Sequence, residues 1–240
     1  MSRILFIMIA LFCVPLAAAE FESDTLQTSQ GDLVMTFIGH GTLCFTHNDK
    51  IVHVDPWTRL ADYEMLPDAD VILLTHHHGD HLDTKAIEAV RTEETRILLT
   101  QTCSETVSGT VLENGDTETV YGIQVRAVPA YNIKHMRNEN QPYHPKGVGN
   151  GYVITFADKT VYVAGDTEDI PEMALLKGQV DVAFLPMNLP YTMSPDMAAH
   201  AAKMVQPDIL YPYHFGDTDV QQLVDLLKDT EMDIRIRNMQ

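Results

Sequence analysis

The strongest signal in this chain is the segment Thr75-His76-His77-His78-Gly79-Asp80-His81. It follows an apolar run of strand length at 71–74, and four of the eleven histidines of the chain fall within six of its positions. Imidazole and carboxylate groups hold zinc and similar divalent cations, and a turn at Gly79 can aim several of them into one space. The segment therefore predicts a metal site whose ligands form the pattern H-x-H-x-D-H, namely His76, His78, Asp80 and His81.

A solvated polar loop that begins a helix is the plainer interpretation of the same segment. Apolar residues recur at helical spacing after His81, and Asp83 or Thr84 is a candidate N-cap for that helix. The need for a helix cap does not explain why three consecutive histidines and a fourth nearby follow an apolar strand. We therefore prefer the metal site, and we expect His77 to point away from its neighbours, at the surface or behind the ligands.

Apolar runs of strand length recur on both sides of this segment, and each half of the chain places strands before helices. No linker, low-complexity tract or repeat separates the halves. The simplest packing is an α/β fold with helices outside two sheets. We expect strands at 33–38, 42–46, 51–54, 71–74, 96–100, 119–121, 124–128, 151–156, 160–164, 182–185 and 209–211, and helices after His81 and at 171–177, 195–205 and 220–228.

The first 19 residues have the pattern of a secretory signal peptide. Arg3 is followed by an apolar run at 4–16 and then by Ala17-Ala18-Ala19, an A-x-A cleavage site. The run is short for a membrane span, although an uncleaved anchor is the alternative. We predict a signal peptide at 1–19, one domain at 20–240, and an exported protein that is periplasmic or secreted.

The chain is strongly acidic, with 34 Asp and Glu against 16 Lys and Arg and a net charge of −18. Loss of Arg3 with the signal peptide makes the charge of the mature chain −19. Binding to nucleic acid or to anionic lipid depends on Lys and Arg. The composition therefore argues against nucleic acid and against stable membrane association after cleavage, and it favours a small-molecule substrate. It sets no oligomeric state.

Two cysteines, Cys44 and Cys103, follow the signal peptide. Export would permit them to pair, but two cysteines do not make a disulfide framework. Cys44 lies inside an apolar run, so we interpret it as a small buried hydrophobic residue.

Further motifs follow strands in an order that resembles the metallo-β-lactamase fold superfamily. They are Gly39-His40-Gly41, Val54-Asp55-Pro56, the H-x-H-x-D-H segment, Ala164-Gly165-Asp166-Thr167 and Tyr213-His214. The branch that the chain resembles contains small metal-dependent hydrolases related to the ascorbate-phosphate lactonase. The resemblance covers nearly the whole mature chain and implies a four-layer αββα sandwich.

The resemblance also implies a centre for two divalent metal ions, with zinc preferred and manganese or iron as alternatives. In that arrangement His76 and His78 hold the first ion, Asp80 and His81 hold the second, Asp166 bridges the two, and His214 completes the second site. The residues alone are less specific. Asp166 at the end of an apolar strand equally fits a turn, and His214 between two aromatic residues fits a packed core.

The third histidine of the first site departs from the pattern of this family. Related chains place it just after the strand that ends here near Ala130, where the closest residue is Asn132, followed by His135 and His144. We predict His144, because the segment that it begins, 144–147, resembles this branch. His135 is the alternative.

Three further features border the predicted centre. Asp55 could orient a metal-bound histidine, or it could simply cap the turn at Pro56. His40 follows a strand at the same end of the sheet and could contact the metal segment or the substrate. The resemblance also places the loop 190–195, which contains Tyr191 and Met193, near the metals, where it would influence the choice of substrate.

Two divalent cations about 3.5–4 Å apart can share a water molecule and lower its pKa towards neutrality. We therefore expect a metal-dependent hydrolase that uses a metal-bridged hydroxide, with Asp80 and Asp166 as the catalytic carboxylates. The substrate would be an ester, lactone, amide or phosphoester. The alternatives are a non-catalytic module that binds or senses metal, and a di-iron redox protein.

Overall fold

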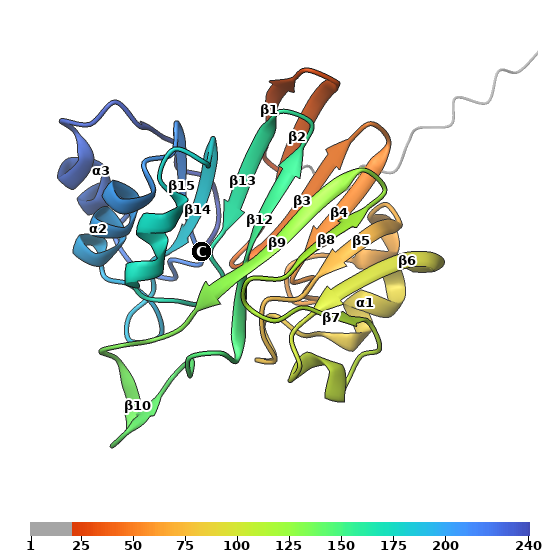
Figure 1. The fold of residues 1–240 in the computed structure, drawn as a ribbon, viewed down its shortest axis with the longest axis horizontal. Helices are drawn as coiled ribbons and strands as arrows, with labels where there is room; N and C mark the ends of the chain where they lie inside the picture. The colour runs from red at the N-terminus through yellow and green to blue at the C-terminus, as the bar shows by residue number, and fades with distance from the viewer. Residues whose placement is uncertain (1–20) are drawn as a thin grey trace, which may run out of the picture.

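The computed structural model describes residues 21–240, so the predicted signal peptide lies outside the described residues. Two seven-stranded sheets form the body of the molecule (Figure 1). In spatial order, the first sheet contains β1 (Ser23–Thr28), β2 (Gly31–Gly39), β3 (Thr42–His47), β4 (Lys50–Val54), β5 (Ala69–Leu73), β6 (Arg91–Leu99) and β7 (Thr110–Val111). The second contains β16 (Asp233–Ile234), β15 (Ile209–Tyr213), β14 (Val182–Pro186), β13 (Lys159–Val163), β12 (Gly149–Phe156), β9 (Ile123–Ala130) and β8 (Thr117–Val120).

The helices are short, and a small hairpin extends from the body near β9 (Figure 1). The hairpin pairs β10 (Met136–Asn138) with β11 (Gln141–Pro142). The helices are α1 (Thr84–Val90), α2 (Pro195–Val205) and α3 (Gln221–Leu227), with 3-10 helices η1 (Tyr63–Met65), η2 (Cys103–Glu105) and η3 (Pro171–Leu176). Within residues 21–240, no helix combines the length and the apolar character that a membrane crossing needs.

The two sheets repeat the same pairing pattern. Strands β1 to β4 pair antiparallel, and β4, β5 and β6 then pair parallel. In the second sheet β8, β9, β12 and β13 pair antiparallel, and β13, β14 and β15 pair parallel. The carboxyl ends of parallel strands meet at one edge of a sheet, where ligands of α/β proteins bind. Both sheets therefore offer such an edge.

Alternation along β5 shows how the layers are arranged. Val71 and Leu73 belong to the large core between the sheets, whereas Ile72 belongs to a smaller core under α1. Across the sheet interface, the ring of Phe45 in β3 packs against that of Phe156 in β12, with centroids 5.7 Å apart. Helices α2 and α3 cover the outer side of the second sheet (Figure 1). The predicted four-layer αββα sandwich is confirmed.

Local signals account for the best-predicted helix. The Ser194 side chain accepts a hydrogen bond from the backbone N–H of Met197, and Pro195 occupies the first turn, so α2 begins and ends where the sequence predicts. The predicted helix at 171–177 instead forms the 3-10 helix η3.

Both cysteines of the described chain are buried and free. Burial raises the pKa of the Cys44 thiol to about 12, which leaves it unreactive at neutral pH. The two cysteines therefore do not pair in this structure.

Candidate metal centre

The motifs that the sequence placed after strands converge at the carboxyl edge of both sheets. Asp55 follows β4, the segment 75–81 follows β5, Asp166 follows β13 and His214 follows β15. These four strands belong to the parallel parts of the sheets. The topology alone therefore brings together residues more than one hundred positions apart.

All seven predicted ligands lie in two neighbouring groups of candidate metal ligands. In the first group, Nδ1 of His78 is 3.1 Å from Nε2 of His76 and 3.2 Å from Nε2 of His144. Oδ2 of Asp166 lies 3.2 Å from Nε2 of His144 and 3.7 Å from Nε2 of His76. The first group thus offers three imidazoles and one carboxylate oxygen.

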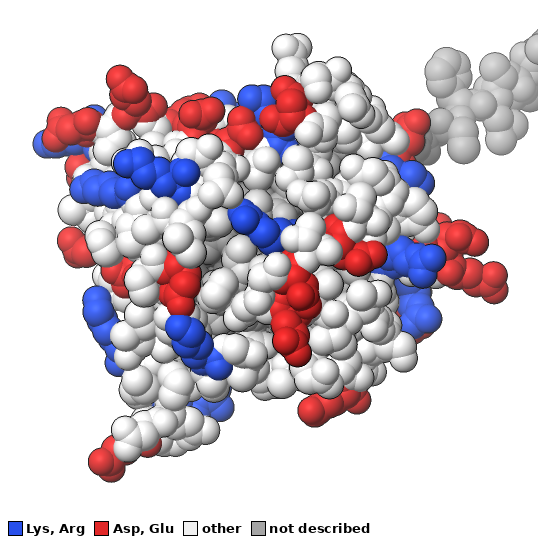
Figure 2. Space-filling view, in the orientation of Figure 1, with Lys and Arg blue, Asp and Glu red and all other residues white. Residues whose placement is uncertain are grey.

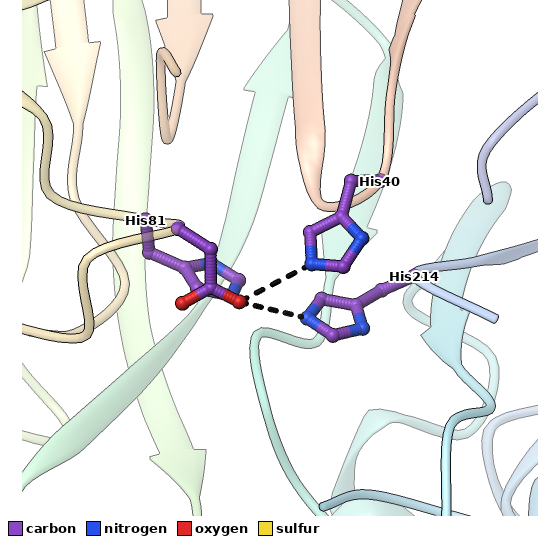
Figure 3. Close-up of side chains that lie close together, drawn as sticks. His40, His81 and His214 are labelled. Atoms are coloured by element: carbon purple, nitrogen blue, oxygen red, sulfur yellow. Dashed lines mark hydrogen bonds and ion pairs between the residues drawn. The ribbon is translucent and has the colours of Figure 1, made fainter. Parts of the chain in front are cut away.

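The second group contains Asp80, His81 and His214, with His40 as an additional member. Oδ2 of Asp80 lies 3.2 Å from Nε2 of His40, 3.6 Å from that of His81 and 3.7 Å from that of His214. Figure 3 shows His40 and His214 approaching one carboxylate from separate segments of the chain, with His81 beside it. The sequence analysis predicted that His40 could contact this segment or the substrate, but it did not include His40 among the metal ligands.

Asp166 connects the two groups. Its Oδ1 atom lies 3.6 Å from Nε2 of His81 and 3.5 Å from Nε2 of His214, whereas its Oδ2 atom faces the first group. A carboxylate placed in this way can donate one oxygen to each of two cations. This is the position that the sequence-based hypothesis assigned to Asp166.

The donor atoms fit divalent cations in spacing and in chemistry. Ligands about 2.0–2.1 Å from a tetrahedral cation are about 3.3–3.4 Å from one another. The separations given above run from 3.1 to 3.7 Å, and all donor atoms within each group lie within 4.8 Å of one another. Three donor atoms on the side of the second group are buried without a hydrogen-bond partner among the described residues, namely Nε2 of His81, Nε2 of His214 and the Oδ1 atom of Asp166 that lies near them. A cation would satisfy all three, which otherwise each carry a desolvation penalty.

Asp55 orients His81 from behind. Its Oδ2 atom lies 2.7 Å from Nδ1 of His81, and both of its oxygens accept hydrogen bonds from Thr75. A hydrogen bond to Nδ1 leaves Nε2 of His81 facing the second group, as in other metal sites whose histidines are held by carboxylates. The geometry favours this interpretation of Asp55 over a simple turn cap.

His144, and not His135, lies in the first group. Nδ1 of His144 is 2.7 Å from Oδ1 of Asn132, and the same oxygen accepts a hydrogen bond from the His144 backbone N–H. Nδ1 of His135 instead lies 2.8 Å from Oε1 of Glu168. Asn132 is thus not a donor of the group, but it holds the histidine that is.

Glu168 is a buried carboxylate that the sequence analysis did not single out. Its oxygens accept hydrogen bonds from three consecutive backbone N–H groups, those of Ile133, Lys134 and His135, and from Nδ2 of Asn132. Burial raises the pKa of Glu168, but these donors outweigh it and lower that pKa overall. An ionised carboxylate therefore fixes the start of the segment that leads to His144.

Three residues at the centre have a strained backbone. His40, Asp55 and His214 have φ values of 49°, 45° and 47°, in the left-handed region that side chains other than glycine avoid. Strained residues persist where surrounding contacts hold them, and they cluster at functional sites. Gly41 has a different role, because a Cβ atom there would lie 2.8 Å from Cε1 of His81.

The carboxylates of the centre are ionised. Burial raises the pKa of Asp166, but His214 and His81 hold it well below its usual value. Burial also raises the pKa of Asp80, but the nearby imidazoles of His214 and His40 lower it further than burial raises it. The site therefore carries negative charge suited to a cation.

His78 in the first group and His81 in the second differ in protonation. Burial and the neighbouring His144 lower the pKa of His78 to about 4, so its lone pair is available. Burial lowers the pKa of His81, but Asp166 and Asp55 raise it to about 9. A cation at the second site must therefore displace a proton from His81.

The comparisons with known proteins agree with this geometry. Residues 34–214 match the beta-lactamase superfamily domain. A metal-dependent hydrolase from Thermococcus kodakarensis is 31% identical over 193 residues, which cover 75% of this chain and 83% of that protein.

Two solved structures share the fold. A candidate metal-dependent hydrolase from Parabacteroides distasonis has a TM-score of 0.88 and 49% identity, over 92% of this chain and 100% of that chain. Igni18, a metallo hydrolase from Ignicoccus hospitalis, has a TM-score of 0.71 at 21% identity, over 87% and 96% of the two chains. The chain therefore belongs to the beta-lactamase superfamily and is a metal-dependent hydrolase.

Proposed function

We propose that this protein is an exported hydrolase that cleaves an ester, lactone, amide or phosphoester bond in a small molecule. Its cofactors are two divalent cations, with zinc preferred over manganese and iron. The observation that supports this most directly is the position of Asp166, whose two oxygens face two separate groups of buried ligands. A site for a single ion needs no such shared carboxylate.

The residues divide into two ligand sets. His76, His78 and His144 hold the first cation, and Asp80, His81 and His214 hold the second, with Asp166 shared. Two bound cations supply Lewis acidity, which lowers the pKa of a water molecule and stabilises negative charge on the attacked oxygen. Asp80 is the more exposed of the two carboxylates, so it lies on the side from which water and substrate enter.

The chain contributes position and charge to the reaction. Asp80 and Asp166 orient the attacking water by accepting hydrogen bonds from it, and Asp55 and Asn132 keep His81 and His144 aimed at the centre. The water adds hydroxyl to the acyl or phosphoryl centre, the bond to the leaving oxygen or nitrogen breaks, and the remaining proton goes to the leaving group. No redox partner is needed.

Export rests on residues 1–19, whose charged start, apolar run and Ala17-Ala18-Ala19 fit a cleaved signal peptide. The strong negative charge supports a small-molecule substrate over nucleic acid. On the face drawn in Figure 2, acidic and basic side chains are interspersed, and the basic ones form no continuous stripe.

A non-catalytic metal-binding module would be favoured if the first site lacked its third histidine. His144 supplies that nitrogen, 3.2 Å from Asp166, so the hydrolase is the better proposal.

The test is metal analysis of the purified mature protein together with a panel of esters, lactones, amides and phosphoesters. We expect one to two equivalents of metal, and loss of both metal and activity when His76, His78 and Asp166 are all replaced by alanine. The matched control is His77→Ala, because His77 is an exposed histidine of the same segment. A folded wild type that binds no metal contradicts the proposal. Metal without activity on the whole panel favours the non-catalytic module, and iron with redox activity favours a di-iron protein.

A further inference from the structure

Large apolar side chains are exposed beside the metal centre. Leu189 and Tyr191, in the loop between β14 and α2, are 48% and 47% exposed. Ile133 and Met136, in the segment that leads to His144, are 46% and 42% exposed. Single exposed apolar residues are ordinary, but several on adjoining loops at one site indicate a binding surface. We call these four residues and Tyr143 the apolar rim.

The two segments of the apolar rim are joined to each other. The rings of Tyr143 and Tyr191 meet edge to face, with centroids 5.1 Å apart. Nδ2 of Asn132 donates a hydrogen bond to the backbone oxygen of Tyr191 at 2.9 Å. Since Asn132 is also held by the buried Glu168, the rim stands on a rigid base.

The apolar rim is also adjacent to the metal ligands. Tyr143 precedes His144 in the chain and lines the same hollow as His76, His78 and Asp166. Strand β14, from which the loop of Leu189 and Tyr191 departs, lies between β13 and β15, which are followed by Asp166 and His214. A group bound at the rim would therefore lie next to a bond held at the centre.

We propose that the apolar rim binds a hydrophobic acyl or aryl group of the substrate, so that the protein prefers carboxylic esters, lactones or amides with such a group over small polar ones. This rests on the proposed function. Covering aliphatic side chains and aromatic faces with apolar surface lowers the free energy of binding, whereas these side chains provide no charge that would attract a polyanion. The negative charge of the chain points in the same direction.

Hydroxamates test the rim without knowledge of the substrate, because they chelate divalent cations and carry any acyl group. The experiment measures binding of acetohydroxamate, octanohydroxamate and benzohydroxamate to the zinc-loaded mature protein by calorimetry. We expect the two larger compounds to bind at least about tenfold more tightly than acetohydroxamate. In Tyr191→Ala this preference should fall below about threefold, and Tyr191→Phe, which keeps the ring, should retain it.

Tyr121→Ala is the matched control. Tyr121 is 42% exposed, and it lies in the turn between β8 and β9, away from the ligand-bearing edge. If the wild type binds all three hydroxamates equally, the proposed role of the apolar rim is wrong, but the metal centre is not contradicted. The same conclusion follows if Tyr121→Ala loses the preference for the larger hydroxamates as much as Tyr191→Ala does. Failure of every hydroxamate to bind the zinc-loaded protein overturns the proposed function, and the rim with it.

Discussion

The amide oxygen of Asn132 lies 2.7 Å from Nδ1 of His144. An amide oxygen only accepts hydrogen bonds, so this contact places the ring proton of His144 on Nδ1 and leaves Nε2 directed at His78 and Asp166. Asn132, the residue nearest to the position where the family resemblance implies a third histidine, thus supports a predicted ligand twelve residues later. Its own amide nitrogen is satisfied by Glu168 and Tyr191.

Replacing Asn132 by alanine should weaken the first metal site and spare the second. Without the acceptor, the imidazole of His144 loses its fixed tautomer and orientation, and loss of such a partner lowers metal affinity by about 10- to 100-fold. The measurement is metal content per chain during titration with a chelator. We expect one equivalent to leave earlier than in the wild type and the other to leave at an unchanged chelator concentration.

Asn114→Ala controls for the loss of a hydrogen-bonded, half-buried amide as such. Asn114 donates hydrogen bonds to Val128, Gly149 and Asn150, and to none of the predicted ligands. If it weakens the first site as much as Asn132→Ala does, the role of Asn132 is general packing.

Alanine at His144 should remove one equivalent of metal, whereas alanine at His135 should leave the metal content unchanged. His144 supplies a nitrogen 3.2 Å from Asp166, but the imidazole of His135 lies against Glu168. Metal analysis of the two variants after extensive dialysis decides between them. If only His135→Ala loses metal, the assignment of His144 to the first site is wrong.

Gly41→Ala should disrupt the second site. Its Cβ atom would lie 2.8 Å from Cε1 of His81 and 3.3 Å from Cδ2 of His214, so both imidazoles must move. Within the segment 75–81, Gly79 has open space around its Cβ position, which makes Gly79→Ala the matched control. We expect one equivalent of metal to be lost from Gly41→Ala and none from Gly79→Ala. The same metal content in both variants would show that the centre tolerates the added methyl group.

Much of the fold could be predicted because its signals are local. Alternating apolar residues identify most strands, and a serine cap with a following proline identifies α2. Strand β1 was missed because Leu26 is its one apolar residue. Pairing with β2 and contacts with the C-terminal segment hold it, and no short window of sequence shows them.

The candidate site divides in the same way. His76, His78, Asp80 and His81 could be predicted from one segment, because four side chains of metal-binding type within six positions after a strand are typical of a metal site. Glu168 was missed, since a single acidic residue after a strand has no local pattern, and its donors lie 33 to 36 residues away. The ligand role of each predicted residue stays a prediction until metal is measured.

Asp24 joins the first strand of the domain to its C-terminal segment, and this contact should make stability depend on pH. Both carboxylate oxygens of Asp24 lie 2.7 Å from a guanidinium nitrogen of Arg237, and the hydroxyl of Tyr211 donates to one of them. Burial raises the pKa of Asp24, but the hydrogen bonds from Arg237 and Tyr211 outweigh burial and lower it. A carboxyl whose pKa is lower in the folded state stabilises the protein above its unfolded pKa of about 3.9, and this contribution disappears as the pH falls through the folded value.

Asp24→Asn should therefore lower the free energy of unfolding by about 1–2 kcal/mol at pH 7, with a smaller difference from the wild type below about pH 3.5. Urea unfolding at both pH values measures this, with Asp32→Asn, an exposed residue of the same hairpin, as control. A difference between wild type and Asp24→Asn that stays constant with pH would mean that the charge of Asp24 does not stabilise this contact.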